Sequence, residues 1–253
     1  MLQKIEGIII RTNDYGETNK ILTVYSRENG KTALMARGAK RPKSRFASVS
    51  QLFVYGTFIY QKSKGIGTLN QADIIDSFRD VRSDLMVTAY GAVMVELIDR
   101  LTEDQDKNPY LFELLYQLLH HLNEGDDGEI LLRILETKML TYSGSTPTLH
   151  ECANCGNTDL PFMFSLRFGG ALCTQCLAND DYHLKVSPAV MKLLRLFQQI
   201  NPARIGQISV KEETKKQLKE VLELYYQEYV GIKLKSKRFL DQMTRFSQPD
   251  VDS

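Results

Sequence analysis

Hydrophobic residues in the first 78 positions occur in short runs with the alternation and β-branched content of strands. The predicted strands are Lys4–Thr12, Lys20–Ser26, Lys31–Arg37, Gln51–Gln61 and Gly67–Ser77. The dipeptide Asn29-Gly30 separates the second run from the third and is a strong hairpin signal. Five short strands without a long helical pattern predict a small closed barrel. The oligonucleotide-binding (OB) barrel is the five-stranded option, and periodicity alone leaves an SH3-like barrel open.

From residue 80 the apolar spacing becomes helical. Predicted helices begin at Asp80 or Ser83, at Asn108-Pro109, at Asp126-Asp127 and at Ser187-Pro188, and a later one covers roughly residues 212–230. The chain is therefore expected to be an α+β multidomain protein. Residues 1–79 form the barrel, and residues 80–253 form an α-helical domain that contains a cysteine segment at about 148–180.

The four cysteines form two pairs with the spacing of a zinc site. Cys152-x2-Cys155 and Cys173-x2-Cys176 are separated by 17 residues. Four thiolates fill a tetrahedral shell and leave no open coordination position, so the pattern predicts one structural Zn²⁺. A thioredoxin-like redox motif would need a strand–helix context that is absent here, and paired disulfides fit a cytosolic chain poorly.

At 253 residues the chain is long enough for one large domain or two modest ones. The N-terminus has no apolar segment after a basic start, and no run of about 18 apolar residues occurs. We therefore expect a cytoplasmic protein without a membrane span.

The net charge of +1 conceals three different parts. Residues 1–80 carry +6, residues 81–160 carry −9 and residues 161–253 carry +4. The acidic middle is typical of the solvated side of helices. By contrast, residues 31–64 hold eight lysines and arginines and no acidic residue, which predicts a surface that attracts polyanions.

The candidate nucleic-acid-binding residues fall into two groups. The first is Lys31, Arg37, Lys40, Arg41, Lys43, Arg45, Lys62 and Lys64, and the second is Lys235, Lys237 and Arg238. The second group extends the nucleic-acid-binding surface of the first or is a solvated tail, and both interpretations stay open. Phe46, Tyr55 and Tyr60 are interleaved with the first group and are candidates for base stacking, although strand alternation turns some of these rings into the barrel.

Motifs of covalent chemistry are missing from the sequence. His150-Glu151 adjoins the cysteines without the spacing of a zinc deaminase, and Gly65-Ile66-Gly67 lacks the lysine of a phosphate loop. The paired His120 and His121 lie on a leucine-rich helix. No catalytic residues are assigned, and the chain is not expected to be an enzyme.

Several short sequence motifs resemble those of the RecO family of bacterial recombination mediators and occur in the same order along the chain. They are Glu6–Arg11, Asp14–Thr18, Gly30-Lys31, Ala36–Lys40, Arg41–Arg45, Gly67–Leu69 with Gln71-Ala72, the two cysteine pairs joined by Phe164-Ser165 and Gly169-Gly170, and Lys235–Leu240. Each motif alone is weak evidence for the resemblance. Together and in this order the motifs are specific to the family, and they span nearly the whole chain.

The resemblance implies an OB barrel, a helical domain with a zinc module and a role without covalent chemistry. Such proteins bind single- and double-stranded DNA and anneal complementary strands. With RecR they help RecA to displace single-strand-binding protein, whose acidic C-terminal tail is an expected partner. Three rival interpretations remain: an RNA-binding or ribosome-associated module, a hydrolase or nuclease with a dispersed site, and an adaptor whose basic patch recruits the acidic tail.

Overall fold

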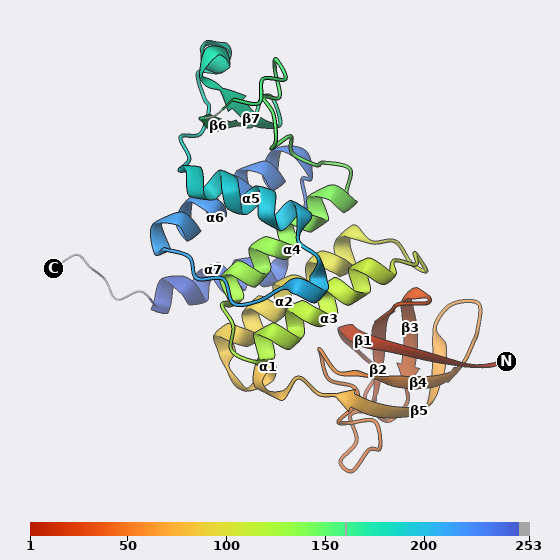
Figure 1. Cartoon of the computed structure of the whole chain (residues 1–253). Helices are drawn as coiled ribbons and strands as arrows, with labels where there is room; N and C mark the ends of the chain where they lie inside the picture. Colours follow the sequence, from red (N-terminus) through yellow and green to blue (C-terminus); the bar gives the residue numbers. More distant parts are fainter. Residues whose placement is uncertain (160, 248–253) are drawn as a thin grey trace. The chain divides into compact units, whose positions relative to one another are not determined.

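The computed structural model describes residues 1–159 and 161–247 (Figure 1). The chain forms two compact units. Unit 1 is Met1–Gly128 together with the C-terminal segment that begins at Leu234, and unit 2 is Glu129–Lys233. The change from strands to helices lies close to the predicted position near residue 79, but the compact units divide elsewhere, because unit 1 contains helices as well as the barrel.

Five strands of unit 1 close into a barrel in the order β1-β2-β3-β5-β4. The strands are β1 (Leu2–Tyr15), β2 (Asn19–Ser26), β3 (Gly30–Ala36), β4 (Tyr55–Gln61) and β5 (Gly67–Asp76). Neighbouring strands pair antiparallel except β3 and β5, which run parallel and complete the ring. This arrangement confirms the predicted five-stranded OB-type fold.

The β2–β3 hairpin turns where Asn29-Gly30 predicted it. Gly30 has φ +59°, and a Cβ at this position would lie 2.1 Å from the carbonyl oxygen of Asp106. The backbone N–H of Gln105 also donates to the carbonyl of Lys31. Glycine is therefore needed both for the backbone conformation and for the close approach of residues 103–107 to the hairpin.

The barrel core contains inward residues of all five strands and four residues of the segment between β3 and β4. It comprises Ile5, Ile9, Leu22, Val24, Leu34, Ala36, Ala39, Phe46, Val49, Val54, Phe58, Tyr60 and Leu69. Ala39, Phe46, Val49 and Val54 belong to the segment between these strands, so the segment packs into the barrel core instead of extending freely into solvent.

Within the described residues 1–128 and 234–247, the helices of unit 1 are α1 (Arg79–Ser83), α2 (Leu85–Leu101), α3 (Pro109–Asn123) and α7 (Lys235–Ser247). The α3 boundary is as predicted, because Asn108 accepts a hydrogen bond from the N–H of Leu111 and Pro109 occupies the first turn. Helix α2 is capped by Asp84, not by the predicted Asp80 or Ser83. Helix α7 was not predicted and contacts α2.

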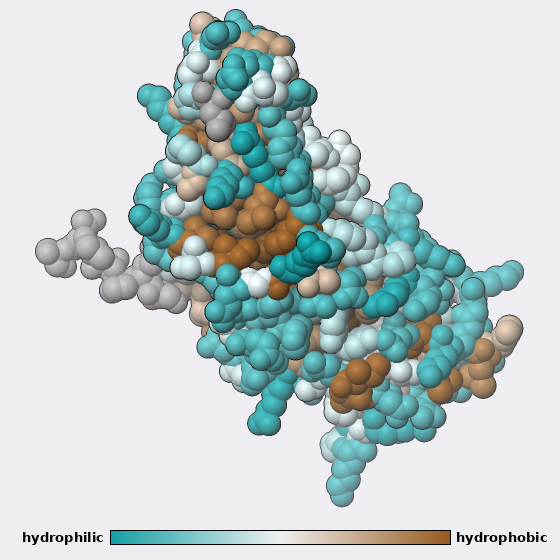
Figure 2. Space-filling view, viewed as in Figure 1, coloured by the Kyte–Doolittle hydropathy of each residue, from teal (hydrophilic) through white to brown (hydrophobic). Residues whose placement is uncertain are grey.

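Unit 2 joins three long helices to a small sheet. Its elements are α4 (Gly128–Tyr142), β6 (Phe162–Ser165), β7 (Gly170–Cys173), the 3₁₀ helices η1 (Thr174–Asn179) and η2 (Pro202–Arg204), α5 (Pro188–Gln199) and α6 (Glu212–Tyr229). Buried Arg133 and Glu136 form an ion pair on α4, and the hydroxyl of Tyr226 donates to the carbonyl of Glu136 at 2.9 Å. Figure 2 shows hydrophobic side chains gathered over α5, a helix on which Leu196 is exposed.

Among the helices of the described ranges 1–159 and 161–247, none has both the length and the apolar character that a bilayer crossing requires.

Candidate nucleic-acid interface and metal centre

The basic segment between β3 and β4 is folded by its own turns. The N–H of Arg41 donates to the carbonyl of Gly38 at 3.0 Å, that of Ser44 to the carbonyl of Arg41 at 3.1 Å, and that of Ala47 to the carbonyl of Ser44 at 3.1 Å. The N–H of Gly38 also donates to the side-chain oxygen of Asn19. These bonds, together with the buried anchors described above, hold the segment against the barrel.

The cations of this segment point outward. Arg37, Arg41, Lys43 and Arg45 are exposed, and none of them makes an ion pair with any residue that the structure describes. The guanidinium of Arg45 lies 4.7 Å from the centre of the Phe46 ring. Their charges are therefore directed at solvent and unneutralised.

Lys40 differs from its neighbours because it has an acidic partner. Its ammonium lies 2.6 Å from the carboxylate of Asp14, and that hydrogen bond lowers the pKa of Asp14. Both side chains remain substantially exposed, so the pair is screened by water and opens readily. A phosphate can take the place of Asp14.

Lys31, one of the predicted DNA-binding residues, is buried, unlike the exposed cations of the segment between β3 and β4. Its side chain is 9% exposed, and its ammonium donates to the carbonyls of Asp99 at 2.8 Å and Thr102 at 2.7 Å. The carboxylates of Asp99 and Asp104 lie 3.7 and 3.6 Å away. Lys31 therefore ties the end of α2 and the following loop to β3.

Lys62 and Lys64 lie on the exposed loop between β4 and β5. They line a cavity together with Arg11 of β1 and Lys107 of the loop between α2 and α3. Arg11 and Lys107 were absent from the predicted set. Arg11 sits on an isoleucine-rich strand and Lys107 in an acidic stretch, so local charge density does not reveal either one.

The three aromatic candidates for base stacking have structural roles. Phe46 and Tyr60 are each 4% exposed and belong to the barrel core, and the hydroxyl of Tyr60 donates to Gln3 at 2.7 Å. Tyr55 is half-buried: its ring packs against Tyr116 with centroids 5.2 Å apart, and its hydroxyl bonds to Glu6. Phe46 and Tyr60 are therefore among the rings that point into the barrel and pack in its core.

The second cationic group lies on α7, in the same compact unit as the barrel. Lys235 and Arg238 are exposed, whereas Lys237 is half-buried. The first turn of α7 is fixed by Glu96 of α2, whose carboxylate accepts hydrogen bonds from the backbone N–H groups of Lys235 and Ser236. Among the residues described, this group therefore belongs to an ordered helix and not to a solvated tail.

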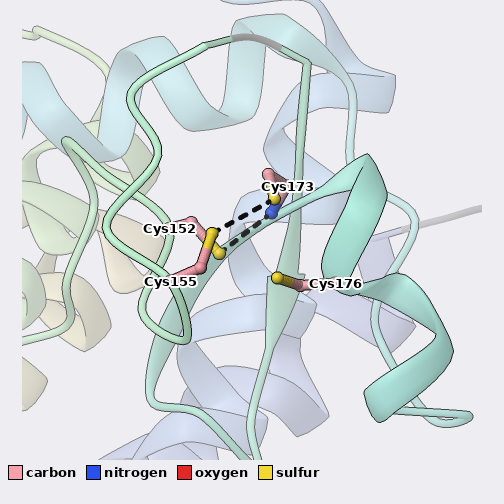
Figure 3. A group of neighbouring side chains, drawn as sticks. All are labelled: Cys152, Cys155, Cys173 and Cys176. Carbon is pink, nitrogen blue, oxygen red and sulfur yellow. Dashed lines mark hydrogen bonds between the residues drawn. The ribbon is translucent and has the colours of Figure 1, made fainter.

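The four cysteine sulfurs converge on one point of unit 2 (Figure 3). Cys152 and Cys155 come from a turn closed by the N–H of Gly156 donating to the carbonyl of Cys152, while Cys173 ends β7 and Cys176 lies in η1. All four sulfurs are within 4.8 Å of one another. The sulfurs of Cys155 and Cys173 are 3.7 Å apart.

The ionisation of these thiols also suits a cation. Burial raises the pKa of Cys152, but backbone N–H groups of Cys173, Cys155 and Asn154 outweigh it and lower that pKa to about 6. For Cys155 the N–H of Asn157 lowers the pKa, but the neighbouring thiols raise it to about 12. One thiolate thus forms readily and a second is opposed, so a divalent ion at the centre would remove the opposition.

The chain matches two family models that follow each other along the sequence. The model named "Recombination protein O N terminal" matches residues 1–78, and the model named "Recombination protein O C terminal" matches residues 82–238. Their junction coincides with the change from barrel to helices.

Full-length relatives agree with the family models. The chain is 54% identical over 243 residues to the DNA repair protein RecO of Halalkalibacterium halodurans, which covers 96% of each chain. It is 51% identical over 243 residues to the DNA repair protein RecO of Bacillus subtilis, with 96% of this chain and 95% of the relative covered. From the barrel, the helical part with its cysteine cluster, and these matches, it follows that the chain belongs to the RecO family of DNA repair proteins.

Proposed function

We propose that this protein is a non-enzymatic mediator of homologous recombination that binds single- and double-stranded DNA and anneals complementary strands. The single observation that carries this proposal is the ordered segment between β3 and β4, which directs Arg37, Arg41, Lys43 and Arg45 into solvent without acidic partners. An excess of unpaired cations on a rigid support favours a polyphosphate ligand.

The guanidinium and ammonium groups of this segment contact phosphates and do not contact the bases. Binding is therefore tolerant of sequence and depends strongly on salt, by roughly 0.7 of a log unit in affinity per log unit of salt for each phosphate neutralised in a single strand. Lys40 joins these contacts when it exchanges Asp14 for a phosphate.

Annealing needs no bond-making group. Two DNA strands repel each other, and a protein that neutralises phosphates of both strands lowers the barrier to their pairing. Lys235 and Arg238 on α7 supply a second cationic surface in the same unit as the barrel. One strand on the barrel and another on α7 is the arrangement that we propose for the annealing complex.

The cysteine cluster binds one structural Zn²⁺ through Cys152, Cys155, Cys173 and Cys176. Four thiolates at 2.3 Å around a tetrahedral ion lie about 3.8 Å from one another, and the 3.7 Å between Cys155 and Cys173 fits that geometry. Zinc would organise the loops around the short β6–β7 sheet, which has little core of its own.

The proposed partners follow from membership of the family. RecR binds this protein to form the mediator complex. The acidic C-terminal tail of single-strand-binding protein recruits that complex, and RecA is then loaded onto the DNA from which single-strand-binding protein has been displaced. We place this activity in the cytoplasm, at the nucleoid.

The test compares the parent protein with a quadruple variant, Lys40→Ala, Arg41→Ala, Lys43→Ala and Arg45→Ala. Fluorescence anisotropy with a labelled oligothymidine, measured over a range of salt concentrations, should show weaker binding and a salt slope shallower by roughly 2 to 3 units. Annealing of complementary strands coated with single-strand-binding protein should slow in parallel.

A variant that keeps both the affinity and the slope of the parent would overturn the assignment of this surface. A matched RNA oligonucleotide that outcompetes the DNA would favour the RNA-binding alternative. Cleavage of end-labelled DNA by the purified protein with magnesium would contradict the non-enzymatic role.

A further inference from the structure

The four cysteines of unit 2 are not equally accessible to solvent. Cys152, Cys173 and Cys176 are 2%, 2% and 6% exposed, whereas Cys155 is an exposed residue. The turn that carries it is also uncovered: Gly156 is exposed, and a Cβ at this position would lie in open space among the residues that the structure describes. A reagent that arrives from solvent therefore reaches the sulfur of Cys155 before the other three.

A buried thiol lies directly behind this exposed one. The sulfur of Cys173 is 3.7 Å from the sulfur of Cys155 (Figure 3). Cys173 is held at the end of β7, where it pairs with Phe162 of β6. A disulfide has a sulfur–sulfur length of about 2.05 Å, so the two atoms need to approach by only about 1.7 Å. The uncovered turn of Cys155 has the space to make that movement.

Backbone hydrogen bonds hold the turn against β7 independently of any ion. The N–H of Ala153 donates to the carbonyl of Ala171 at 2.7 Å. Within the turn, the N–H of Cys152 donates to the carbonyl of Asn157 at 2.7 Å, and the N–H of Gly156 donates to the carbonyl of Cys152 at 2.8 Å. These bonds keep the sulfurs of the turn close to Cys173 when metal is lost, so a change at the sulfurs is reversible.

The surroundings of Cys155 favour an uncharged reagent. The side chains at positions 153, 154 and 156–158 carry no charge. Glu151 and Asp159, on either side of the turn, are exposed and acidic. Anionic oxidants such as glutathione disulfide are therefore repelled, whereas hydrogen peroxide is small and neutral and approaches freely.

We propose that Cys155 is an oxidation site for hydrogen peroxide and that Cys173 is its disulfide partner. The inference rests on the proposed zinc site, because bound Zn²⁺ keeps the sulfurs as thiolates, the form that reacts with peroxide. An exposed thiolate beside a second thiol is the arrangement of redox-sensing cysteines. The disulfide leaves Cys152 and Cys176 as two of the original four ligands, too few for a closed tetrahedral site, and the ion is released.

The chemistry has two steps and balances with hydrogen peroxide as the oxidant. The thiolate of Cys155 attacks one peroxide oxygen, the O–O bond breaks, and a sulfenic acid and hydroxide result after proton transfer. The thiolate of Cys173 then attacks the sulfur of that sulfenic acid, the S–S bond forms, and the S–O bond breaks to release a second hydroxide. Two thiolates are oxidised by two electrons in total, and the peroxide is reduced.

The experiment treats the zinc-loaded full-length protein with hydrogen peroxide in the presence of a chromogenic zinc chelator. One Zn²⁺ per chain should be released, and peptide mapping without reduction should find Cys155 joined to Cys173. Dithiothreitol followed by zinc sulfate should restore the metal. A protein that keeps its zinc at peroxide concentrations that oxidise free cysteine would overturn the proposal, and a Cys152–Cys155 disulfide would overturn the assigned partner.

Two matched variants separate the exposed ligand from a buried one. Cys155→His and Cys176→His each leave three cysteines and one histidine, a set that also binds zinc. After subtraction of the release without peroxide, Cys155→His should lose zinc more slowly than the parent by roughly tenfold or more, because its reactive thiolate is gone. Cys176→His keeps that thiolate and should match the parent. The reverse order of the two variants would contradict the assignment of Cys155.

A third readout uses the parent protein alone and does not depend on how well the variants fold. Dimedone reacts with sulfenic acids, and a brief peroxide pulse in its presence should label Cys155. Labelling of another cysteine in its place would refute the oxidation site.

Failure of this inference is distinguishable from failure of the proposed function. If the protein binds one zinc ion and keeps it in peroxide, the oxidation site is wrong and the zinc site stands. If it binds no zinc, the zinc site is wrong as well. The proposed DNA binding is tested separately, by the quadruple variant of unit 1.

Discussion

Glu96 on α2 caps a helix that begins 139 residues later, because its carboxylate accepts the backbone N–H of Ser236 at 2.8 Å and also the hydroxyl of that serine. The other carboxylate oxygen accepts the N–H of Lys235 at 3.1 Å. A side chain from another helix thus caps the N-terminus of α7, a role that usually belongs to the residue just before the helix. Its negative charge also interacts favourably with the N-terminal end of the helix dipole.

Replacing Glu96 by alanine should loosen the first turn of α7. The loss of a cap costs about 1 kcal/mol, which corresponds to roughly fivefold faster exchange of the amides that open with that turn. Hydrogen exchange followed by mass spectrometry reports on residues 235–240 directly. Glu220→Ala, an exposed glutamate on α6, is the control and should leave α7 unchanged. Equal exchange in the two variants would contradict the capping role.

The same contact predicts a pH dependence. Burial raises the pKa of Glu96, but the hydrogen bonds from Ser236 and Lys235 outweigh it, so the pKa lies below the usual 4.5. A carboxyl whose folded pKa is lowered stabilises the protein fully above its unfolded pKa and loses that effect as pH falls through the folded value. The stability difference between the parent and Glu96→Ala should therefore be constant above about pH 5 and shrink below about pH 4. A difference that shrinks toward neutral pH would refute this.

Lys31→Met should destabilise unit 1 by roughly 3 kcal/mol, because the buried carbonyls of Asp99 and Thr102 lose their donor. Urea unfolding measures the loss, with the exposed barrel residue Lys4→Met as the control. A Lys31→Met protein with normal stability and weakened DNA binding would return Lys31 to the DNA interface.

Phe46 should matter for stability and not for stacking. Phe46→Ala removes a core side chain and should cost about 3–5 kcal/mol, and Phe46→Leu should cost less. Thermal melting gives the order of the variants, with the exposed Tyr15→Leu as the control. Folded Phe46→Leu should bind oligothymidine like the parent; a selective loss of affinity would show that the ring contacts a base.

Cys152→Ser should abolish stoichiometric zinc and unfold the region around β6 and β7. Metal binding contributes on the order of 10 kcal/mol to sites of this kind. Atomic emission gives the metal content and hydrogen exchange locates the unfolding. The control is Gln175→Ala, which lies between the ligands Cys173 and Cys176 and should keep the metal. Unchanged metal in Cys152→Ser would show that the four thiols are not the site.

Features set by neighbours in the sequence were predictable. The Asn29-Gly30 turn, the Asn108 cap of α3 and the close approach of the two cysteines within each pair depend on residues a few positions apart, and the structure places them as expected. The spacing of the two pairs is that of a known zinc site, so their convergence was also expected. Alternation of apolar residues likewise located the strands, because a two-residue period identifies the face that the core buries.

Features set by distant contacts were not predictable. Helix α7 has few apolar residues, and its cap comes from Glu96. The burial of Lys31 depends on carbonyls at the end of α2, which its position in a basic part of the sequence does not reveal. Likewise, the cavity takes Lys107 from a loop beyond the barrel, and no local pattern connects that residue with Lys62.

The segment that carries Arg41 and Arg45 is anchored by Ala39, Phe46 and Val49 inside the barrel. Because its shape is settled when the protein folds, capture of a nucleic acid strand requires little further ordering on the protein side. The flexible strand is then the part that adapts. Under the proposed function, an ordered row of exposed cations of this kind binds strands of any sequence with similar affinity, because it contacts phosphates.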